Sequence, residues 1–88
     1  MEEIGIVKKY TNWQNIKKQS CGAYKFYLES PSGEIEELRN IEYFYMGGSG
    51  EYVIVIAKNK YYIGYWYNDN IIYCFAECDS LKEACLSL

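Results

Sequence analysis

The most reactive side chains in this 88-residue sequence are four cysteines, Cys21, Cys74, Cys78 and Cys85. Thiolates are zinc ligands and nucleophiles. In a regular strand, Cys74 and Cys78 share one face with their sulfurs two pleats apart, roughly 13 Å. That separation is too large for one tetrahedral zinc site, so the sequence predicts buried, reduced thiols and no metal, with a metal site or a disulfide as the alternatives.

The chain has no histidine and one arginine, Arg39. Histidine is the side chain whose unperturbed pKa lies near neutrality, so its absence disfavours general acid–base and triad chemistry. The segment 47–50 is as glycine-rich as a phosphate-binding loop, but Glu51 follows it where such loops carry a lysine. The sequence therefore predicts a hairpin loop there, no cofactor and no enzymatic activity. An enzyme that uses Cys74, Cys78 or a tyrosine is a distant alternative.

Tyrosine is the most distinctive residue of the chain, with eleven copies. The predicted strand 61–67 alternates two sets of side chains. One face carries Tyr61, Ile63, Tyr65 and Tyr67, and the other carries Tyr62, Gly64 and Trp66. We expect helices to cover one face of the sheet and the opposite face to expose tyrosines. Such rings either stabilise the sheet as cross-strand pairs, form a protein or self-association surface, or stack nucleic-acid bases. The acidic balance of the chain disfavours the last option.

Acidic residues cluster around one predicted hairpin, and they are Glu29, Glu34, Glu36, Glu37 and Glu42. With Pro31 and Ser32 at the centre of the turn, Glu29 is predicted to lie directly opposite Glu34. Like charges in that arrangement destabilise a hairpin slightly. The cluster therefore suggests an acidic surface for a basic partner. The alternative is a charged edge that prevents aggregation of sheets.

Alternating and continuous apolar runs predict the elements that position these residues. The predicted strands cover 24–29, 41–46, 52–57, 61–67 and 71–78, and two weaker strand patterns cover 4–9 and 34–39. Capping-box patterns start a predicted helix at Thr11, which should run to about Ser20, and a second at Ser80. The second of these helices should place Leu81, Ala84, Cys85 and Leu88 on one apolar stripe.

The predicted fold class is α+β, formed by a single domain over 1–88. It is an antiparallel β-meander of four to six strands, with a short N-terminal helix and a short C-terminal helix packed on one face. The formal net charge of −3 and the pI near 4.9 disfavour direct contact with nucleic acid or anionic lipid. No apolar run is long enough to span a bilayer, and the first residues lack a basic leader pattern. We expect a cytoplasmic protein.

The chain is short, acidic and aromatic-rich, and it has no catalytic set. In these general features it resembles the small inhibitory proteins that phages deploy against bacterial defence, anti-CRISPR proteins among them, and the immunity proteins that neutralise bacterial toxins. The resemblance covers no specific motif. It implies a non-enzymatic inhibitor that blocks a larger, basic, nucleic-acid-handling protein partner.

The residues expected to bind that partner are Glu29, Glu34, Glu36, Glu37, Tyr65, Trp66 and Tyr67. The glutamates would steer the encounter, and the aromatic residues would supply affinity. The alternative function is a small-ligand module that stacks a nucleotide signal on Tyr65, Trp66 or Tyr67 in a dimer cleft. A homodimer is therefore left open.

Overall fold

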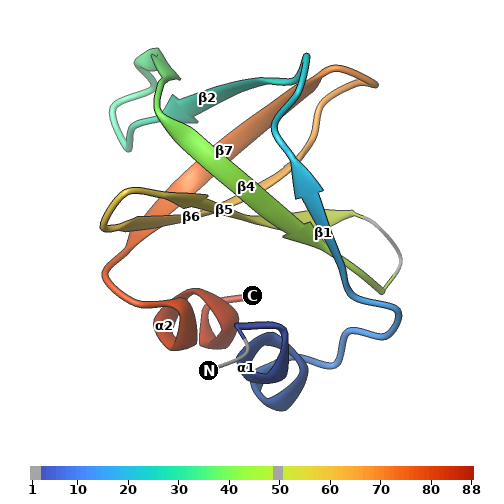
Figure 1. Ribbon diagram of the computed structural model, residues 1–88. Coiled ribbons are helices and arrows are strands. Elements are labelled where there is room, and N and C mark those ends of the chain that lie inside the picture. Colours follow the sequence, from blue (N-terminus) through green and yellow to red (C-terminus); the bar gives the residue numbers. More distant parts are fainter. Residues whose placement is uncertain (1–2, 49–50) are drawn as a thin grey trace.

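The computed structural model describes residues 3–48 and 51–88. It shows two short helices packed side by side below one strongly curved sheet (Figure 1). The elements in chain order are α1 (Glu3–Tyr10), β1 (Lys17–Ser20), β2 (Lys25–Glu29), β3 (Ile35–Leu38), β4 (Ile41–Met46), β5 (Tyr52–Ala57), β6 (Lys60–Trp66), β7 (Ile71–Cys78) and α2 (Leu81–Leu86). The α+β class and the two terminal helices are confirmed. The described sheet has seven strands, so the predicted count of four to six is too low.

The strand order in the sheet is β1-β4-β5-β6-β7-β2-β3. Strands β4 to β7 form the predicted antiparallel meander, and the bounds predicted for β5 and β7 are confirmed. The pairing of β2 with β7 is parallel, which a simple meander does not contain. Turn residues specify hairpins between neighbouring strands, but the place of β2 depends on burying Phe26 and Leu28 against distant strands.

The first twenty residues contradict the predicted element types. The segment 4–9 is helical, and β1 lies within the predicted helix 11–20. Thr11 does not start a helix. Its hydroxyl donates a hydrogen bond to the carbonyl of Val7 (2.6 Å) and accepts one from the amide of Trp13 (3.2 Å), so it follows the end of α1. The β-branched residues of α1 favour a strand locally, but packing of Ile4 and Val7 under the sheet overrides that preference.

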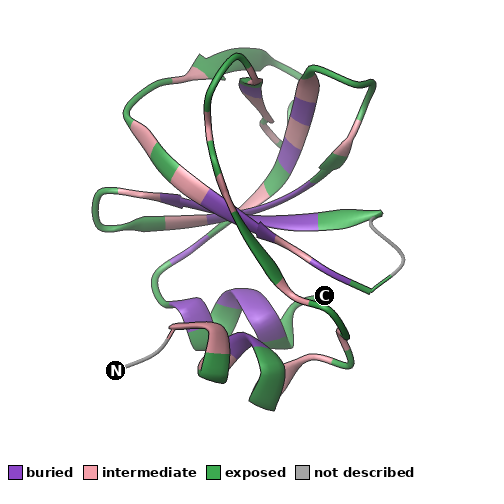
Figure 2. Cartoon of the chain, turned by 45° about the vertical axis from the view of Figure 1, so that its right-hand side comes forward, coloured by how far each residue is buried: buried purple, intermediate pink, exposed green. Residues whose placement is uncertain are grey.

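The sheet curves so far that it has two hydrophobic cores. The first lies between the helices and the sheet, and it includes Val7, Ile54, Ile63 and Leu81. The second lies inside the curve, where Phe26 of β2 contacts Phe44 of β4 with ring centroids 5.7 Å apart. Three strands separate β2 from β4 in the sheet order, so this contact requires the curvature. Figure 2 shows buried residues on the sides of the helices that face the sheet and in the middle of the strands.

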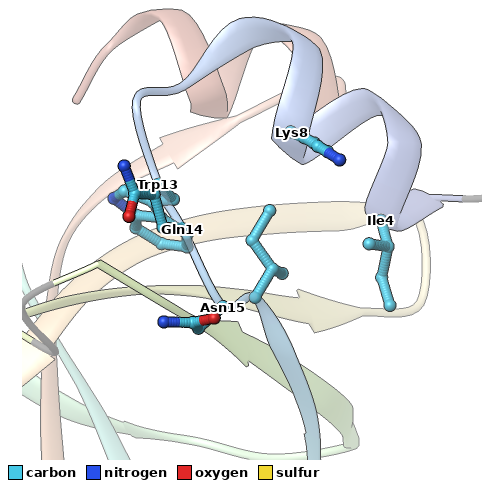
Figure 3. A pocket seen from close by; sticks show the side chains of 6 residues that line it. Ile4, Lys8, Trp13, Gln14 and Asn15 are labelled. Atoms are coloured by element: carbon cyan, nitrogen blue, oxygen red, sulfur yellow. The ribbon is translucent and has the colours of Figure 1, made fainter.

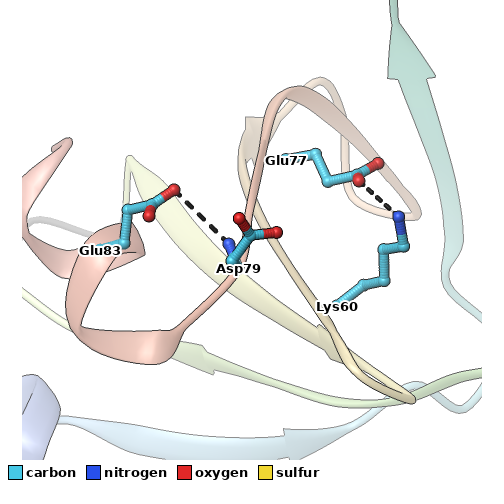
Figure 4. Close-up of polar contacts among 4 residues, drawn as sticks. All are labelled: Lys60, Glu77, Asp79 and Glu83. Carbon is cyan, nitrogen blue, oxygen red and sulfur yellow. Dashed lines mark hydrogen bonds and ion pairs between the residues drawn. The ribbon is translucent and has the colours of Figure 1, made fainter.

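The predicted N-cap of α2 at Ser80 is confirmed, but the reciprocal bond of the predicted capping box goes to the residue before the cap, Asp79, and not to Ser80. The hydroxyl of Ser80 accepts a hydrogen bond from the amide of Glu83 (3.1 Å), and the carboxylate of Glu83 accepts one from the amide of Asp79 (3.5 Å; Figure 4). Near this corner, Lys60 donates to Glu77 (2.6 Å), which links the start of β6 to β7. Three of the four residues of the predicted stripe are buried, but Leu88 lies beyond the end of α2 and is exposed.

The β2–β3 hairpin has a different register from the predicted one. Glu29 lies opposite Ile35, not opposite Glu34. Gly33 adopts a left-handed conformation (φ 91°), and its amide donates to the carbonyl of Ser30 (2.9 Å). This glycine adds one residue to the turn and shifts the pairing by one position. The predicted like-charge pair across the hairpin is therefore wrong.

Candidate binding face

Six aromatic side chains, five from four strands and one from the residue after β6, form a continuous row on the helix-bearing face of the sheet, beyond the area that the helices cover. We call this row the aromatic stripe, and its members are Tyr27, Tyr52, Tyr65, Tyr67, Tyr73 and Phe75. Neighbouring ring centroids lie between 4.7 Å and 6.3 Å apart. The stripe thus runs across β5, β6, β7 and β2.

Strand register explains why these rings meet. Tyr52 lies opposite Tyr65, Tyr65 opposite Tyr73, and Tyr73 opposite Tyr27. Residues directly opposite each other in a sheet project from the same face. Ile54 and Ile63, which share this face further along the same strands, lie under the helices. One face of the sheet therefore carries both the first core and the aromatic stripe.

Phe75 joins the stripe because of a β-bulge. Ile63 pairs with Ala76 and Gly64 pairs with Cys74, so Phe75 is an extra residue on β7. A Cβ at Gly64 would lie 2.7 Å from the carbonyl oxygen of Tyr73, closer than real Cβ contacts. Only glycine allows this approach without a shift of the backbone. Phe75 was not among the predicted binding residues, and the isolated Gly64 inside the strand pattern is the sequence signal that could have indicated the bulge.

The stripe is substantially exposed. Tyr52, Tyr65, Tyr67 and Phe75 expose 45%, 37%, 59% and 46% of their surface. At roughly 200 Å² for a whole aromatic side chain, the exposed parts of these four rings amount to roughly 400 Å². A contiguous apolar patch of that size is comparable to the largest on monomeric proteins, which are often functional.

The exposed apolar surface continues from the stripe onto α2. Leu86 and Leu88 are 61% and 44% exposed, and they line a depression together with Tyr52 and Lys9. At the other end, Ile35 of β3 is also exposed. Every exposed large hydrophobic residue in the described part of the chain thus belongs to the helix-bearing side of the molecule.

Of the three aromatic residues predicted to bind a partner, the structure brings two together. Tyr65 and Tyr67 belong to the stripe. Trp66 projects into the second core, where its ring lies 5.4 Å from that of Tyr24 and 5.7 Å from that of Phe44. The exposed tyrosines also lie on the helix-bearing face and not on the opposite one, because the curved ends of the sheet fill the opposite face. The three residues are therefore not a single stacking platform.

The predicted glutamates lie together on the β2–β3 hairpin and are all exposed. Glu37 lies opposite Tyr27, and Glu29 is two residues further along β2, so both share the face of the stripe. Glu36 lies opposite Leu28 on the other face. Glu34 is in the turn region, where its amide donates to the hydroxyl of Ser30 (3.1 Å). Two carboxylates therefore border the stripe directly.

A second group of polar residues fixes α1 to the sheet. The phenols of Tyr43 and Tyr45 both donate hydrogen bonds to one carboxylate oxygen of Glu3, over 2.7 Å in the case of Tyr45. Burial and the neighbouring carboxylate raise the pKa of Tyr43 to about 12, and they also raise the pKa of Tyr45. The amine of Lys18 lies 4.1 Å from the centroid of the Tyr43 ring. These phenols remain protonated at neutral pH and act as hydrogen-bond donors.

The cysteines do not form a common site. Cys78 and Cys85 belong to the first core, whereas Cys74 belongs to the second. The reason is the bulge in β7, which lies between Cys74 and Cys78 and makes their side chains project from opposite faces of the sheet. The prediction that Cys74 and Cys78 share a face is therefore wrong. Burial is confirmed for these three residues, while Cys21 is partly exposed, and none of the four is in a disulfide. Burial raises the pKa of Cys74 to about 12 and that of Cys85 to about 11, which keeps these thiols protonated and weakly nucleophilic.

A further depression lies between α1 and the segment that follows it (Figure 3). Its lining includes Ile4, Lys8, Trp13, Gln14 and Asn15. These residues offer one cation, two amides and apolar surface, but no carboxylate or thiol that could pair with the amine in acid–base chemistry. Within residues 3–48 and 51–88, no group of three metal-ligating side chains is placed to hold a metal ion.

Comparison of the chain with models of protein families, with curated proteins and with solved structures finds no significant match. In the described part of the chain, neither helix has the length and apolar character needed to cross a bilayer. Functional inference therefore depends on the aromatic stripe and its surroundings.

Proposed function

We propose that this chain is a non-enzymatic binding protein that docks on a larger, basic protein through the aromatic stripe and blocks the surface it covers. The single observation behind this proposal is the stripe itself, six contacting rings of which four are more than one-third exposed. Rigid aromatic side chains are the commonest energetic anchors of protein interfaces.

The size of the stripe also suits a protein partner. A standard interface buries about 800 Å² on each partner, with an apolar centre and a polar rim. The exposed rings supply roughly half of that area. Leu86 and Leu88 extend the apolar surface at one end, and Glu29 and Glu37 form a charged rim at the other.

The charge of that rim favours a basic partner. Glu37 lies opposite Tyr27, and within the described residues its ion-pair partner is the exposed guanidinium of Arg39 at 3.7 Å. An exposed pair at this distance contributes little and leaves the carboxylate available. A nucleic-acid-handling protein carries the complementary basic surface, so this class of partner fits the rim.

The experiment compares variants whose altered side chains are neighbours in sequence but lie on opposite faces of the sheet. A tagged chain captures proteins from a nuclease-treated bacterial lysate, and binding of the captured partner is then measured with purified components. Tyr65→Ala and Tyr67→Ala should raise the dissociation rate at least tenfold, because they remove desolvated anchors. Trp66→Phe, which alters the second core only, should leave both rates unchanged.

Two glutamate variants provide a matched test of the electrostatic contribution. Glu37→Gln and Glu36→Gln remove the same charge from adjacent residues, but only Glu37 shares the face of the stripe. Glu37→Gln should slow association severalfold at low salt, and Glu36→Gln should have a smaller effect. Folding of each variant is checked by circular dichroism. If the folded tyrosine variants bind the partner as the wild type does, the stripe is not the binding surface.

A further inference from the structure

The two outer strands of the sheet have opposite charge. β1 begins with Lys17-Lys18, and β3 contains Glu36-Glu37. All four side chains are exposed. Within the described residues each of these strands pairs with one neighbour, so the other side of its backbone is open to a further strand. The sheet thus ends in a basic edge and an acidic edge.

The topology makes these two edges point in opposite directions. Five of the six strand pairings are antiparallel, and the pairing of β2 with β7 is parallel. Each antiparallel pairing reverses the direction of the strand, and the five reversals between β1 and β3 leave these two strands antiparallel to each other. If a second copy is moved along the sheet without being turned over, its β1 meets β3 of the first copy as an antiparallel strand. The single parallel pair in the fold is the cause of this compatibility.

The charges lie on both faces of each edge. Lys18 is opposite Tyr45 and so projects on the helix-bearing face, and Lys17 projects on the other face. Glu37 shares the helix-bearing face with Tyr27, and Glu36 lies on the other. When β1 continues the sheet beyond β3, a lysine and a glutamate therefore meet on each face.

Two registers of the β3–β1 pair bring a lysine and a glutamate together on each face. One places Lys18 directly opposite Glu37, with Lys17 diagonal to Glu36, and the other places Lys17 opposite Glu36, with Lys18 diagonal to Glu37. Both direct and diagonal neighbours are within reach of these long side chains.

We propose that β1 of one copy pairs with β3 of a second copy and that the chain associates head to tail through its sheet edges. The occupant of each edge is thus another copy of this protein. The charges prevent β1 from pairing with β1 and β3 from pairing with β3, because like charges would then meet, but they favour the mixed pair. Each edge is only four residues long, so the association is weak, concentration-dependent and sensitive to salt. It involves none of the rings of the aromatic stripe, but it shares Glu37 with the acidic rim of the stripe.

Sedimentation velocity of the full chain tests this proposal at about 0.01 M and about 1 M salt, where the screening lengths are about 30 Å and about 3 Å. The weight-average sedimentation coefficient should rise with protein concentration at low salt and should be that of a monomer at high salt. The double variant Lys17→Glu/Lys18→Glu has two acidic edges, and Glu36→Lys/Glu37→Lys has two basic edges. Each alone should remain monomeric, and an equimolar mixture of the two should associate again.

The control variant Lys58→Glu/Lys82→Glu makes the same change in net charge as Lys17→Glu/Lys18→Glu, at exposed positions in the β5–β6 turn and in α2. It should associate as the wild type does. Amide hydrogen exchange supplies a second measurement, since exchange in β1 and β3 should slow as the protein concentration rises at low salt. A wild-type chain that is monomeric at low salt and millimolar concentration would overturn the proposal. So would association that survives in either charge-reversed variant alone, or a mixture that stays monomeric.

Discussion

Two regions of one sheet face have similar apolar residues and opposite surroundings. Ile54 and Ile63 lie under the helices and are fully buried, whereas Tyr52 and Tyr65, two residues away on the same strands and the same face, are 45% and 37% exposed. Residues next to each other on a strand face therefore differ here in whether a helix covers them. The helices are too short to cover the whole face. The covered region therefore stabilises the fold, and the open region is available to a partner.

The type of residue follows this division. The covered region holds mainly aliphatic side chains, and the hydroxyl of its buried tyrosine, Tyr45, donates a hydrogen bond to Glu3. The open region holds tyrosines, whose rings pack against each other while their hydroxyls stay hydrated. A region that served only to stabilise the sheet would not need so much exposed apolar surface, so the contrast supports a binding role for the stripe.

The largest effect on this comparison is expected from truncation of the covered region. Leu81 and Leu86 both belong to α2, but they are 5% and 61% exposed. Leu81→Ala should lower the free energy of unfolding by about 2–5 kcal/mol, because it leaves a cavity beneath the helix. Leu86→Ala should change it by less than about 0.5 kcal/mol. Urea denaturation measures both, and equal effects would mean that α2 does not cover the sheet as described.

An intermediate effect is expected at the bulge that separates the two regions. Gly64→Ala forces a Cβ against the carbonyl of Tyr73 and the sulfur of Cys74 (2.7 Å and 3.0 Å), so it should cost about 1–3 kcal/mol of stability. It should also displace Phe75 from the stripe, because the bulge is what places this residue there. Gly5→Ala is the control, since Gly5 is exposed in α1 and alanine favours helix. A Gly64→Ala protein as stable as the wild type would show that the bulge can be lost without cost.

The last effect is a graded decline in stability at alkaline pH, which is small near pH 9 and grows toward pH 11, and it arises from the buried residues. Burial raises the pKa of Cys74 to about 12 and that of Cys85 to about 11, from an ordinary value of 9.0. The unfolded chain releases these protons first, so their contribution to stability is complete below about pH 9 and is lost as the pH rises toward the folded-state values. Tyr43, whose pKa is raised to about 12, acts in the same direction.

Thermal unfolding in the presence of a reductant, at intervals from about pH 8 to about pH 11, measures this decline. The melting temperature should fall steadily above about pH 9 and recover when the sample is returned to pH 8. A melting temperature that is constant over this range would mean that the thiols ionise as readily in the folded chain as in the unfolded one.

The second half of the fold was predictable from the sequence because its signals are local. Alternation and β-branched runs set the bounds of β5 and β7, and Ser80 with Glu83 set the start of α2. The first twenty residues were not predictable in this way. Their local pattern favours a strand followed by a helix, and the packing of α1 against α2 and the sheet reverses that order.

The candidate site was predictable only in part. The sequence alone determined that tyrosines and glutamates are abundant, that Tyr65 and Trp66 lie on opposite faces, and that the chain has no histidine for ordinary acid–base chemistry. Only the tertiary structure decided which face stays open, because that depends on the length of the helices and the curvature of the sheet. It also decided that Phe75 joins the tyrosines, because a bulge changes the face from which the following side chains project without any change in the composition of the strand. Pairing across strands joins residues that are distant in the chain, and no local pattern specifies that pairing.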